Sequence, residues 1–225
     1  MESITINPSV ETNKLSRHFG AGGCRCFSNS LSTKLESYSN RLDKLLLPRL
    51  HYQIERIDNI GKRSVSIHGG TTFMSQKLSS ALDGSNEIVC FVATIGTVIE
   101  EEINDLIARN RLSEAYVLDA MGSVAVEDMV EQFHQCKKSP FFSEDKSVTL
   151  RFSPGYCDWP VTEQKKLFGL FDSEPQGIEL LDSCLMQPRK SVSGVFGLVH
   201  CSSSSFQPYN PCRHCKKTDC IARRV

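Results

Sequence analysis

The sequence predicts an α+β domain, in which a mainly antiparallel twisted sheet carries helices packed on it. Residues 50–57 alternate apolar and polar side chains, and a second such run at 64–68 follows Asn59-Ile-Gly61, which indicates a hairpin. Residues 87–95 form a run of Ile, Val, Cys, Phe and Val, typical of a strand buried on both faces. Two stretches with helical spacing follow that run directly.

The segments that precede the hairpin are an arm and a helix. Residues 1–28 are polar, lack a clear period and contain Asn7-Pro8, so they predict an N-terminal arm. Apolar side chains at helical spacing predict a helix over Leu31–Leu47, which Pro48 ends. After the hairpin, Thr72–Leu82 is expected to be a short helix with Met74 and Leu78 facing inward.

Two helices are expected after the buried strand. Thr97 and Glu100 have the spacing of a capping box at the start of the first helix. Its predicted inner face consists of Val98, Ile99, Ile103, Leu106 and Ile107. Ser113 is expected to cap the second helix, which runs to about Gln135. Its apolar stripe consists of Leu118, Met121, Ala125, Met129 and Phe133.

Small and acidic residues in the second helix allow two interpretations each. Gly122 and Ser123 would let a neighbouring helix or a ligand approach closely. Glu127, Asp128 and Glu131 would form a solvated face, although a ligand contact by Glu127 or by Asp119 is the alternative.

The last third of the chain returns to the sheet. Residues 147–152 predict a strand, 161–171 a helix, and 178–181 and 192–199 two strands around a turn at 186–188. Trp159, at the start of the helix, would either attach it to the core or line the mouth of a ligand site.

Composition excludes several classes of protein. A chain of 225 residues fits one domain, or one domain with an arm. Its 26 Lys and Arg residues balance 26 Asp and Glu residues, so nothing favours nucleic acid or an anionic membrane as a partner. No apolar run approaches about 18 residues, and the N-terminus lacks a signal-peptide layout. We therefore expect a cytoplasmic protein, whose 10 cysteines are thiols or metal ligands rather than disulfides.

The loop Arg151–Pro160, between a predicted strand and a predicted helix, is the candidate binding site. Arg151 offers a planar donor fork for a carboxylate, and Gly155 lets a ligand approach the backbone. Tyr156 offers a ring face to a cation. A ligand with an acid group and a cation is an amino acid or S-adenosylmethionine. The alternative is a tight turn whose arginine pairs with an acid.

The loop resembles the Arg-x-x-Pro-Gly-Tyr loop of the activation (reactivation) domain of vitamin B12-dependent methionine synthase, which binds S-adenosylmethionine. Three further segments agree in order and spacing, namely Ala93-Thr-Ile-Gly96, Gly177–Pro188 and Ser191-Val-Ser-Gly194. The resemblance extends over residues 88–200 and implies a free-standing member of that family. It implies a domain at 29–200 and a separate cysteine-rich tail at 201–225.

The resemblance also implies which residues bind S-adenosylmethionine. Arg151 would hold the ligand carboxylate, while Pro154, Gly155 and Tyr156 shape the pocket. Phe196 and Gly197 occupy the positions after Ser-Val-Ser-Gly that contact this ligand in the family. Two features depart from the family pattern: small residues replace part of an aromatic pair at 195–197, and an acidic contact near the start of the domain has no match.

The C-terminal tail carries a separate motif, Cys212-x-x-Cys215-x4-Cys220, with Cys201 available as a fourth thiolate. Thiolates so closely spaced in a cytoplasmic chain are typical of metal sites. The motif leaves three alternatives open, which are an iron–sulfur cluster, zinc, or free thiols that switch by oxidation.

The leading hypothesis is an S-adenosylmethionine-binding activation subunit that supports reductive methylation of cobalamin on a B12-dependent methyltransferase, with methionine synthase as the first candidate. Such a chain needs a corrinoid-binding methyltransferase partner and an electron donor, and no catalytic acid or base stands out in it. The alternative is an iron–sulfur or zinc accessory protein that reduces or docks on a corrinoid protein without binding S-adenosylmethionine. A third hypothesis is a docking scaffold without chemistry.

Overall fold

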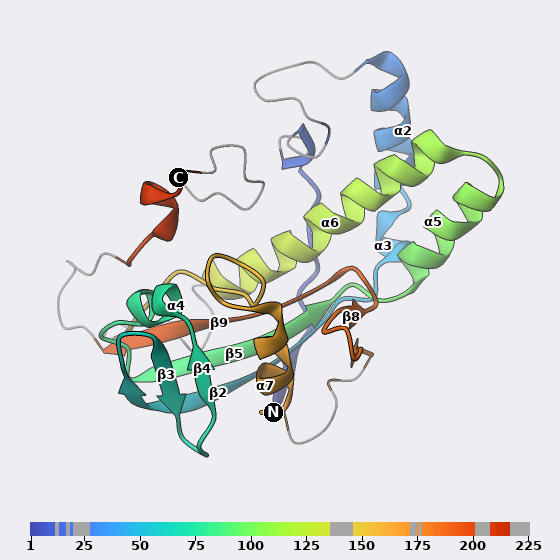
Figure 1. Cartoon of the computed structure of the whole chain (residues 1–225). Helices are drawn as coiled ribbons and strands as arrows, with labels where there is room; N and C mark the ends of the chain where they lie inside the picture. The colour runs from blue at the N-terminus through green and yellow to red at the C-terminus, as the bar shows by residue number, and fades with distance from the viewer. Residues whose placement is uncertain are drawn as a thin grey trace.

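The computed structural model of the chain describes residues 1–11, 14–16, 19, 28–135, 146–171, 175, 177–200 and 208–216. These residues form a twisted sheet with helices on both faces (Figure 1). No helix in these ranges combines the length and the apolar character that a membrane span requires.

Every pairing in the seven-stranded sheet is antiparallel. The strand order is β4-β3-β2-β5-β9-β6, and β1 also pairs with β2. The strands are β1 (Glu2–Ile4), β2 (Arg49–Ile60), β3 (Ser64–Ile67), β4 (Thr72–Met74), β5 (Glu87–Thr94), β6 (Lys146–Val148) and β9 (Ser191–His200). A small separate hairpin contains β7 (Glu179–Leu180) and β8 (Met186–Gln187). The predicted α+β class with a mainly antiparallel sheet is confirmed.

Strand β5 separates two hydrophobic cores because its side chains alternate between the faces of the sheet. Val89 and Phe91 belong to the core under α5 (Val98–Ala108) and α6 (Leu112–Gln135), whereas Ile88 and Cys90 belong to the core on the opposite face. The first core also contains α2 (Asn29–Ser39) and α3 (Leu42–Leu45). The second core lies beneath α4 (Gln76–Ala81) and α7 (Gln164–Phe168), which follows the short helix η1 (Val161–Glu163) (Figure 1).

The apolar stripe predicted for α6 is buried as expected, with Met121 and Met129 fully enclosed. Close packing explains the small residue Gly122, since an added Cβ would lie 3.0 Å from Ile99 Cδ1 and 3.4 Å from Lys190 Cε. Beside it, Lys190 Nζ donates to Ser123 Oγ at 2.8 Å and pairs with Asp119 Oδ1 at 2.8 Å. These contacts attach the beginning of β9 to α6, so Asp119 has a structural partner.

Two predicted helices have different boundaries in the structure. The helix expected over Thr72–Leu82 begins only at Gln76, because Thr72–Met74 pairs with β3 as strand β4. Met74 is therefore 50% exposed rather than buried, whereas Leu78 is buried as predicted. The helix expected over Leu31–Leu47 is divided into α2 and α3, with a turn at Asn40 and Arg41 between them.

The predicted capping box at Thr97 is not formed. The side chain of Thr97 makes no capping hydrogen bond, and Glu100 instead accepts a hydrogen bond from the backbone N–H of Lys190 at 2.9 Å. Ile107, expected on the inner face of α5, is 50% exposed. Helix α6 starts at Leu112, so Ser113 lies inside it, and the Ser113 hydroxyl accepts from Lys34 Nζ at 2.8 Å.

Part of the predicted N-terminal arm is held against the domain. The buried carboxylate of Asp128 on α6 accepts hydrogen bonds from the Ser9 N–H at 2.7 Å and from Lys14 Nζ at 2.6 Å. Burial alone would raise the pKa of Asp128, but the hydrogen bonds from Lys14, Ser9 and Gln132 outweigh it and lower the pKa. Asp128 therefore anchors the arm instead of belonging to the solvated face expected from the sequence.

Candidate functional site

The Arg151–Pro160 loop begins at the edge of the sheet beside β9. Phe152 exchanges two backbone hydrogen bonds of 2.8 Å with Val195, so the predicted strand 147–152 is a short β6 followed by an isolated bridge. Gly194 makes this approach possible, since an added Cβ would lie 2.7 Å from the Phe152 carbonyl oxygen and 2.9 Å from Phe91 Cζ. The Ser-Val-Ser-Gly segment and the loop are therefore in direct contact.

The loop closes on itself after Pro154. The Gly155 N–H donates to the Trp159 carbonyl at 2.8 Å, and the Trp159 N–H donates to the Tyr156 carbonyl at 3.1 Å. Gly155 has a φ of +89°, a left-handed conformation that favours glycine. Trp159 is 1% exposed and packs against Phe73 and Phe152, so it attaches the loop to the core and does not line a ligand mouth. Tyr156, by contrast, is 49% exposed.

Arg151 points from this loop to helix α6. Its Nη2 lies 2.8 Å from Glu127 Oε2 and 3.3 Å from Glu131 Oε2. The Arg151 side chain is 10% exposed, whereas Glu127 and Glu131 are 49% and 37% exposed. Arg151 Nε is buried and has no hydrogen-bond partner among the described residues. The site thus combines one guanidinium, held beneath the surface, with two carboxylates that reach solvent.

This ion pair corresponds to the alternative interpretation of Arg151, in which the arginine pairs with an acid. The sequence contains a signal for it, since Glu127 and Glu131 are four residues apart and project from the same face of a helix. A ligand carboxylate would have to replace one of the two glutamates at Nη2. The role of Arg151 in ligand binding stays a prediction.

Phe196 and Gly197 lie inside the domain rather than at its surface. Phe196 is 0% exposed and its ring contacts Phe133 and His134. The Gly197 N–H donates to Thr149 Oγ1 at 2.9 Å, and a Cβ at this position would collide with Ser85. A contact between either residue and a ligand stays a prediction, because their side-chain positions here are filled by protein.

Asp158 attaches the loop to helix α4. Its carboxylate accepts hydrogen bonds from Ser75 Oγ at 2.6 Å and from the backbone N–H of Gln76 at 2.8 Å, and it also reaches Lys77 N. Burial acts to raise the pKa of Asp158, but the combined effect of these hydrogen bonds is larger, so the pKa is lowered. The charged carboxylate therefore stabilises the first turn of α4 and the position of the loop.

The stability that Asp158 contributes should be lost in acid. Because its folded pKa is lowered, the contribution is present above the unfolded pKa of about 3.9 and disappears as pH falls through the folded pKa. We expect Asp158→Ala to lower the free energy of unfolding by about 1 kcal/mol at neutral pH. Urea unfolding between pH 7 and pH 2.5 should show this difference narrowing below about pH 4. Asp105→Asn, in an exposed pair with Arg109, is the control and should change little.

Of the four predicted metal ligands, Cys201 and Cys220 lie outside the described residues. Cys212 is the second residue of the short helix η2 (Pro211–His214). Cys215 follows this helix and is exposed. Among the described residues, no three His, Cys, Asp or Glu side chains are already gathered where they could hold one metal ion. The predicted metal site is not assembled within this part of the chain.

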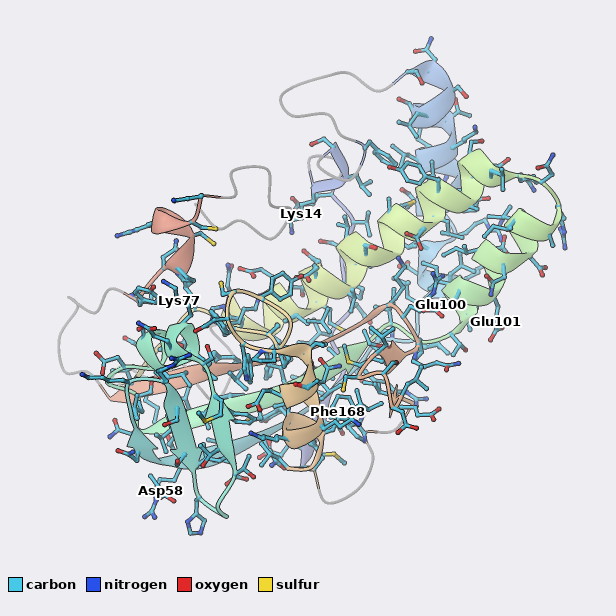
Figure 2. All side chains as sticks on the ribbon, in the orientation of Figure 1. Lys14, Asp58, Lys77, Glu100, Glu101 and Phe168 are labelled. Atoms are coloured by element: carbon cyan, nitrogen blue, oxygen red, sulfur yellow. The ribbon has the colours of Figure 1, made fainter. Side chains whose placement is uncertain are left out.

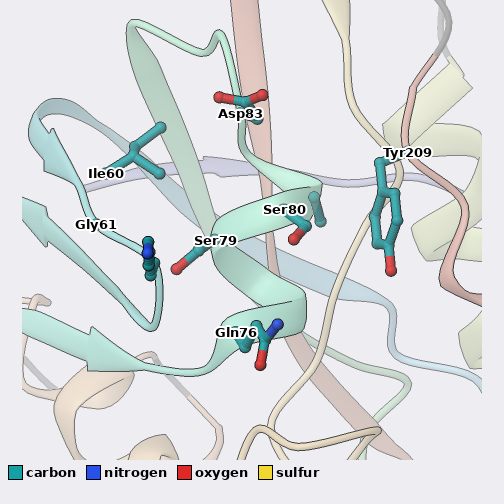
Figure 3. A pocket seen from close by; sticks show the side chains of 9 residues that line it. Ile60, Gly61, Gln76, Ser79, Ser80, Asp83 and Tyr209 are labelled. Carbon is teal, nitrogen blue, oxygen red and sulfur yellow. The ribbon is translucent and has the colours of Figure 1, made fainter.

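Two hollows of the described structure lie away from Arg151. One, of about 670 Å³, is lined by polar side chains of α4, the β2–β3 turn and Tyr209 (Figure 3). The other, of about 420 Å³, lies between Thr97 and the segment that leads into the β7–β8 hairpin. Neither hollow is lined by residues of the Arg151–Pro160 loop.

Comparisons with known proteins agree with this architecture. Residues 72–210, more than half of the 225-residue chain, match the family described as vitamin B12 dependent methionine synthase, activation domain. The chain is also similar to a solved structure described as the crystal structure of the MetH reactivation domain bound to AdoHcy. The TM-score is 0.63 at 18% identity, covering 92% of this chain and 81% of that one. At that identity the likeness shows the fold. No curated protein sequence matches.

Proposed function

The chain belongs to the family of vitamin B12-dependent methionine synthase activation domains, and from this premise we propose that it binds S-adenosylmethionine and supports reductive methylation of cobalamin on a partner protein. The partner would be a corrinoid-binding methyltransferase, with methionine synthase as the first candidate. The family assignment covers the loop, the helix pair and the Ser-Val-Ser-Gly strand, which are the parts this proposal uses.

The observation that carries the proposal is the position of Arg151 between two solvent-facing carboxylates. A guanidinium binds a ligand carboxylate through charge-assisted hydrogen bonds, and its limited exposure strengthens them. When the ligand carboxylate takes Nη2, Glu127 and Glu131 become available to the α-ammonium or the sulfonium of the same ligand. The exposed ring of Tyr156 offers a further surface for a cation.

A solved neighbour supports the ligand class. That structure is described as bound to AdoHcy, which differs from S-adenosylmethionine by the transferred methyl group. We propose that the present chain takes the same class of ligand at its Arg151–Pro160 loop.

In the proposed reaction the chain acts by positioning its ligand. The methyl group would pass from the sulfonium of S-adenosylmethionine to the reduced corrinoid of the partner, and S-adenosylhomocysteine would be the other product. The corrinoid supplies the difficult chemistry, and a separate electron donor supplies the electron that reduces it. Arg151 and the Pro154–Tyr156 segment would hold the methyl donor in line with the approaching cobalt, which requires no acid or base from this chain.

Calorimetric titration of S-adenosylmethionine into the full chain tests the proposal. We expect saturable binding at one site, with S-adenosylhomocysteine competing for it. The second measurement is transfer of a labelled methyl group from S-adenosylmethionine to cobalamin in the presence of a strong reductant and a corrinoid-binding methyltransferase. Absence of heat and of competition at millimolar ligand would contradict S-adenosylmethionine binding.

The cysteine-rich tail favours a second role beside the first. We propose that Cys201, Cys212, Cys215 and Cys220 include the ligands of an iron–sulfur cluster or a zinc ion, in a cytoplasmic protein whose thiols stay reduced. A low-potential cluster could pass an electron to the corrinoid, whereas zinc would only order the tail. Iron, sulfide and zinc analysis of anaerobically purified protein separates these cases from each other and from free thiols.

A further inference from the structure

The N-terminal arm lies against helix α6 directly beside the ion pair of Arg151. Lys14 Nζ pairs with Asp128 Oδ1 at 2.6 Å. Ser9 donates to Asp128 Oδ2 from its backbone N–H at 2.7 Å and from its hydroxyl at 3.1 Å. Leu15, the neighbour of Lys14, is 2% exposed and belongs to the same core as α6. The arm therefore places one ammonium group at a defined position on this helix, and Figure 2 shows Lys14 projecting from the N-terminal segment toward it.

Helix geometry places the carboxylate held by the arm next to the carboxylates held by Arg151. Successive residues of an α-helix are rotated by about 100°, so Glu131 projects between Glu127 and Asp128 around the axis of α6. Arg151 Nη2 contacts Glu127 at 2.8 Å and Glu131 at 3.3 Å. The pKa of Lys14 is raised, mainly by its hydrogen bond to Asp128 and to a smaller extent by the charge of Glu131. The arm, α6 and the loop thus contribute to one cluster of five charged groups.

The charge of this cluster suits one of two related ligands better than the other. Its two cations and three carboxylates leave one net negative charge at neutral pH. The lowered pKa of Asp128 keeps that carboxylate ionised. S-adenosylmethionine carries a carboxylate, an ammonium and a sulfonium, and therefore one net positive charge. S-adenosylhomocysteine has an uncharged sulfur and no net charge, so the cluster attracts it less.

We infer that Lys14 and Asp128 are specificity-determining residues, which set the charge of the cluster and thereby the preference of the site for the methyl donor over its demethylated product. The inference rests on the proposed binding of S-adenosylmethionine and gives the arm a part in it. The two ligands differ only by the methyl group and the charge that it brings, so both would make the same contact with Arg151. Asp128 strengthens the attraction for the sulfonium, and Lys14 moderates it. A product that is held less tightly can leave once the methyl group has been transferred.

Calorimetric titration of both ligands into the full chain tests the inference through the ratio of their dissociation constants. Lys14→Gln removes a positive charge, so the preference for S-adenosylmethionine should increase by about 2- to 5-fold at low ionic strength and by less in high salt, which screens the charge. Asp128→Asn should shift the ratio by a similar factor in the opposite direction. The double variant regains the native charge of the cluster, so it should regain the native ratio. A loosened arm would weaken both ligands alike and leave the ratio unchanged.

Lys166→Gln is the matched control. The Lys166 side chain is 42% exposed, like that of Lys14, and pairs with Glu163 at 2.7 Å, but it lies on α7 over the opposite core of the sheet. Its ratio should equal the native one. An unchanged ratio in Lys14→Gln and Asp128→Asn, with both ligands still bound, would overturn this inference alone. Failure of the native chain to bind either ligand would overturn the proposed function and this inference together.

Discussion

Replacing Arg151 by alanine should weaken S-adenosylmethionine binding by about 2–3 kcal/mol, or roughly 30- to 150-fold in Kd. The substitution removes the only proposed partner of the ligand carboxylate and leaves Glu127 and Glu131 facing it, which adds repulsion. Loss of the ion pair itself should cost little stability, because both glutamates reach solvent. Calorimetry on the folded variant measures the effect.

Two further variants make this result specific. Arg151→Lys keeps the charge but loses the planar fork, so we expect an intermediate affinity. Arg189→Ala removes an arginine that is 63% exposed and 3.9 Å from Glu100, and it should bind S-adenosylmethionine like the native chain. Equal affinity of the native and Arg151→Ala proteins would contradict the assignment of Arg151.

Trp159→Ala should lower the free energy of unfolding by about 3–5 kcal/mol, the range found when large aromatic side chains are removed from cores. The indole is 1% exposed and contacts Phe73 and Phe152, so its loss leaves a cavity beneath the Arg151 loop. Its Nε1 has no hydrogen-bond partner among the described residues, so the loss is one of packing. Urea unfolding followed by circular dichroism, which does not depend on the removed fluorophore, measures it.

Tyr156→Ala in the same loop is the matched control. Its ring is 49% exposed, and we expect a stability change within about 0.5 kcal/mol. If the two substitutions destabilised the protein equally, the assignment of Trp159 as the anchor of the loop would be wrong. The pair also separates packing from binding, since a ligand contact by Tyr156 would change affinity without changing stability.

The sequence predicted the architecture because its strongest patterns are local. The apolar run of β5 required burial on two faces, and the alternation in β2 required a half-covered antiparallel strand. The apolar stripe of α6 required one face of that helix to pack against the sheet. The Pro-Gly bend was also visible as residue types, whereas the close approach of Phe152 to Gly194 was not predicted. Each of these patterns indicates the same secondary structure whether the segment is considered alone or within the folded domain.

The sequence-based prediction failed where a segment has several acceptable local structures and a contact outside the segment selects one. Thr72–Met74 could continue a helix, but β3 offers it backbone hydrogen bonds, so it becomes strand β4. Glu100 could cap its own helix, but its carboxylate accepts a hydrogen bond from the Lys190 N–H instead. In each case a contact outside the segment, with the neighbouring strand β3 or with Lys190, outweighs a local preference of about 1 kcal/mol or less.

Composition and local patterning by themselves determined the α+β class, the antiparallel sheet, the helix pair and the position of the candidate loop. Only the tertiary structure decided that Arg151 pairs with Glu127 and Glu131, that Phe196 lies in the core, and that Asp128 holds the N-terminal arm. The physical reason is that periodicity records which face of an element is buried, whereas charge pairs depend on which elements pack against each other. These contacts between elements are set by the packing of the whole domain, so they leave no periodic pattern in the sequence.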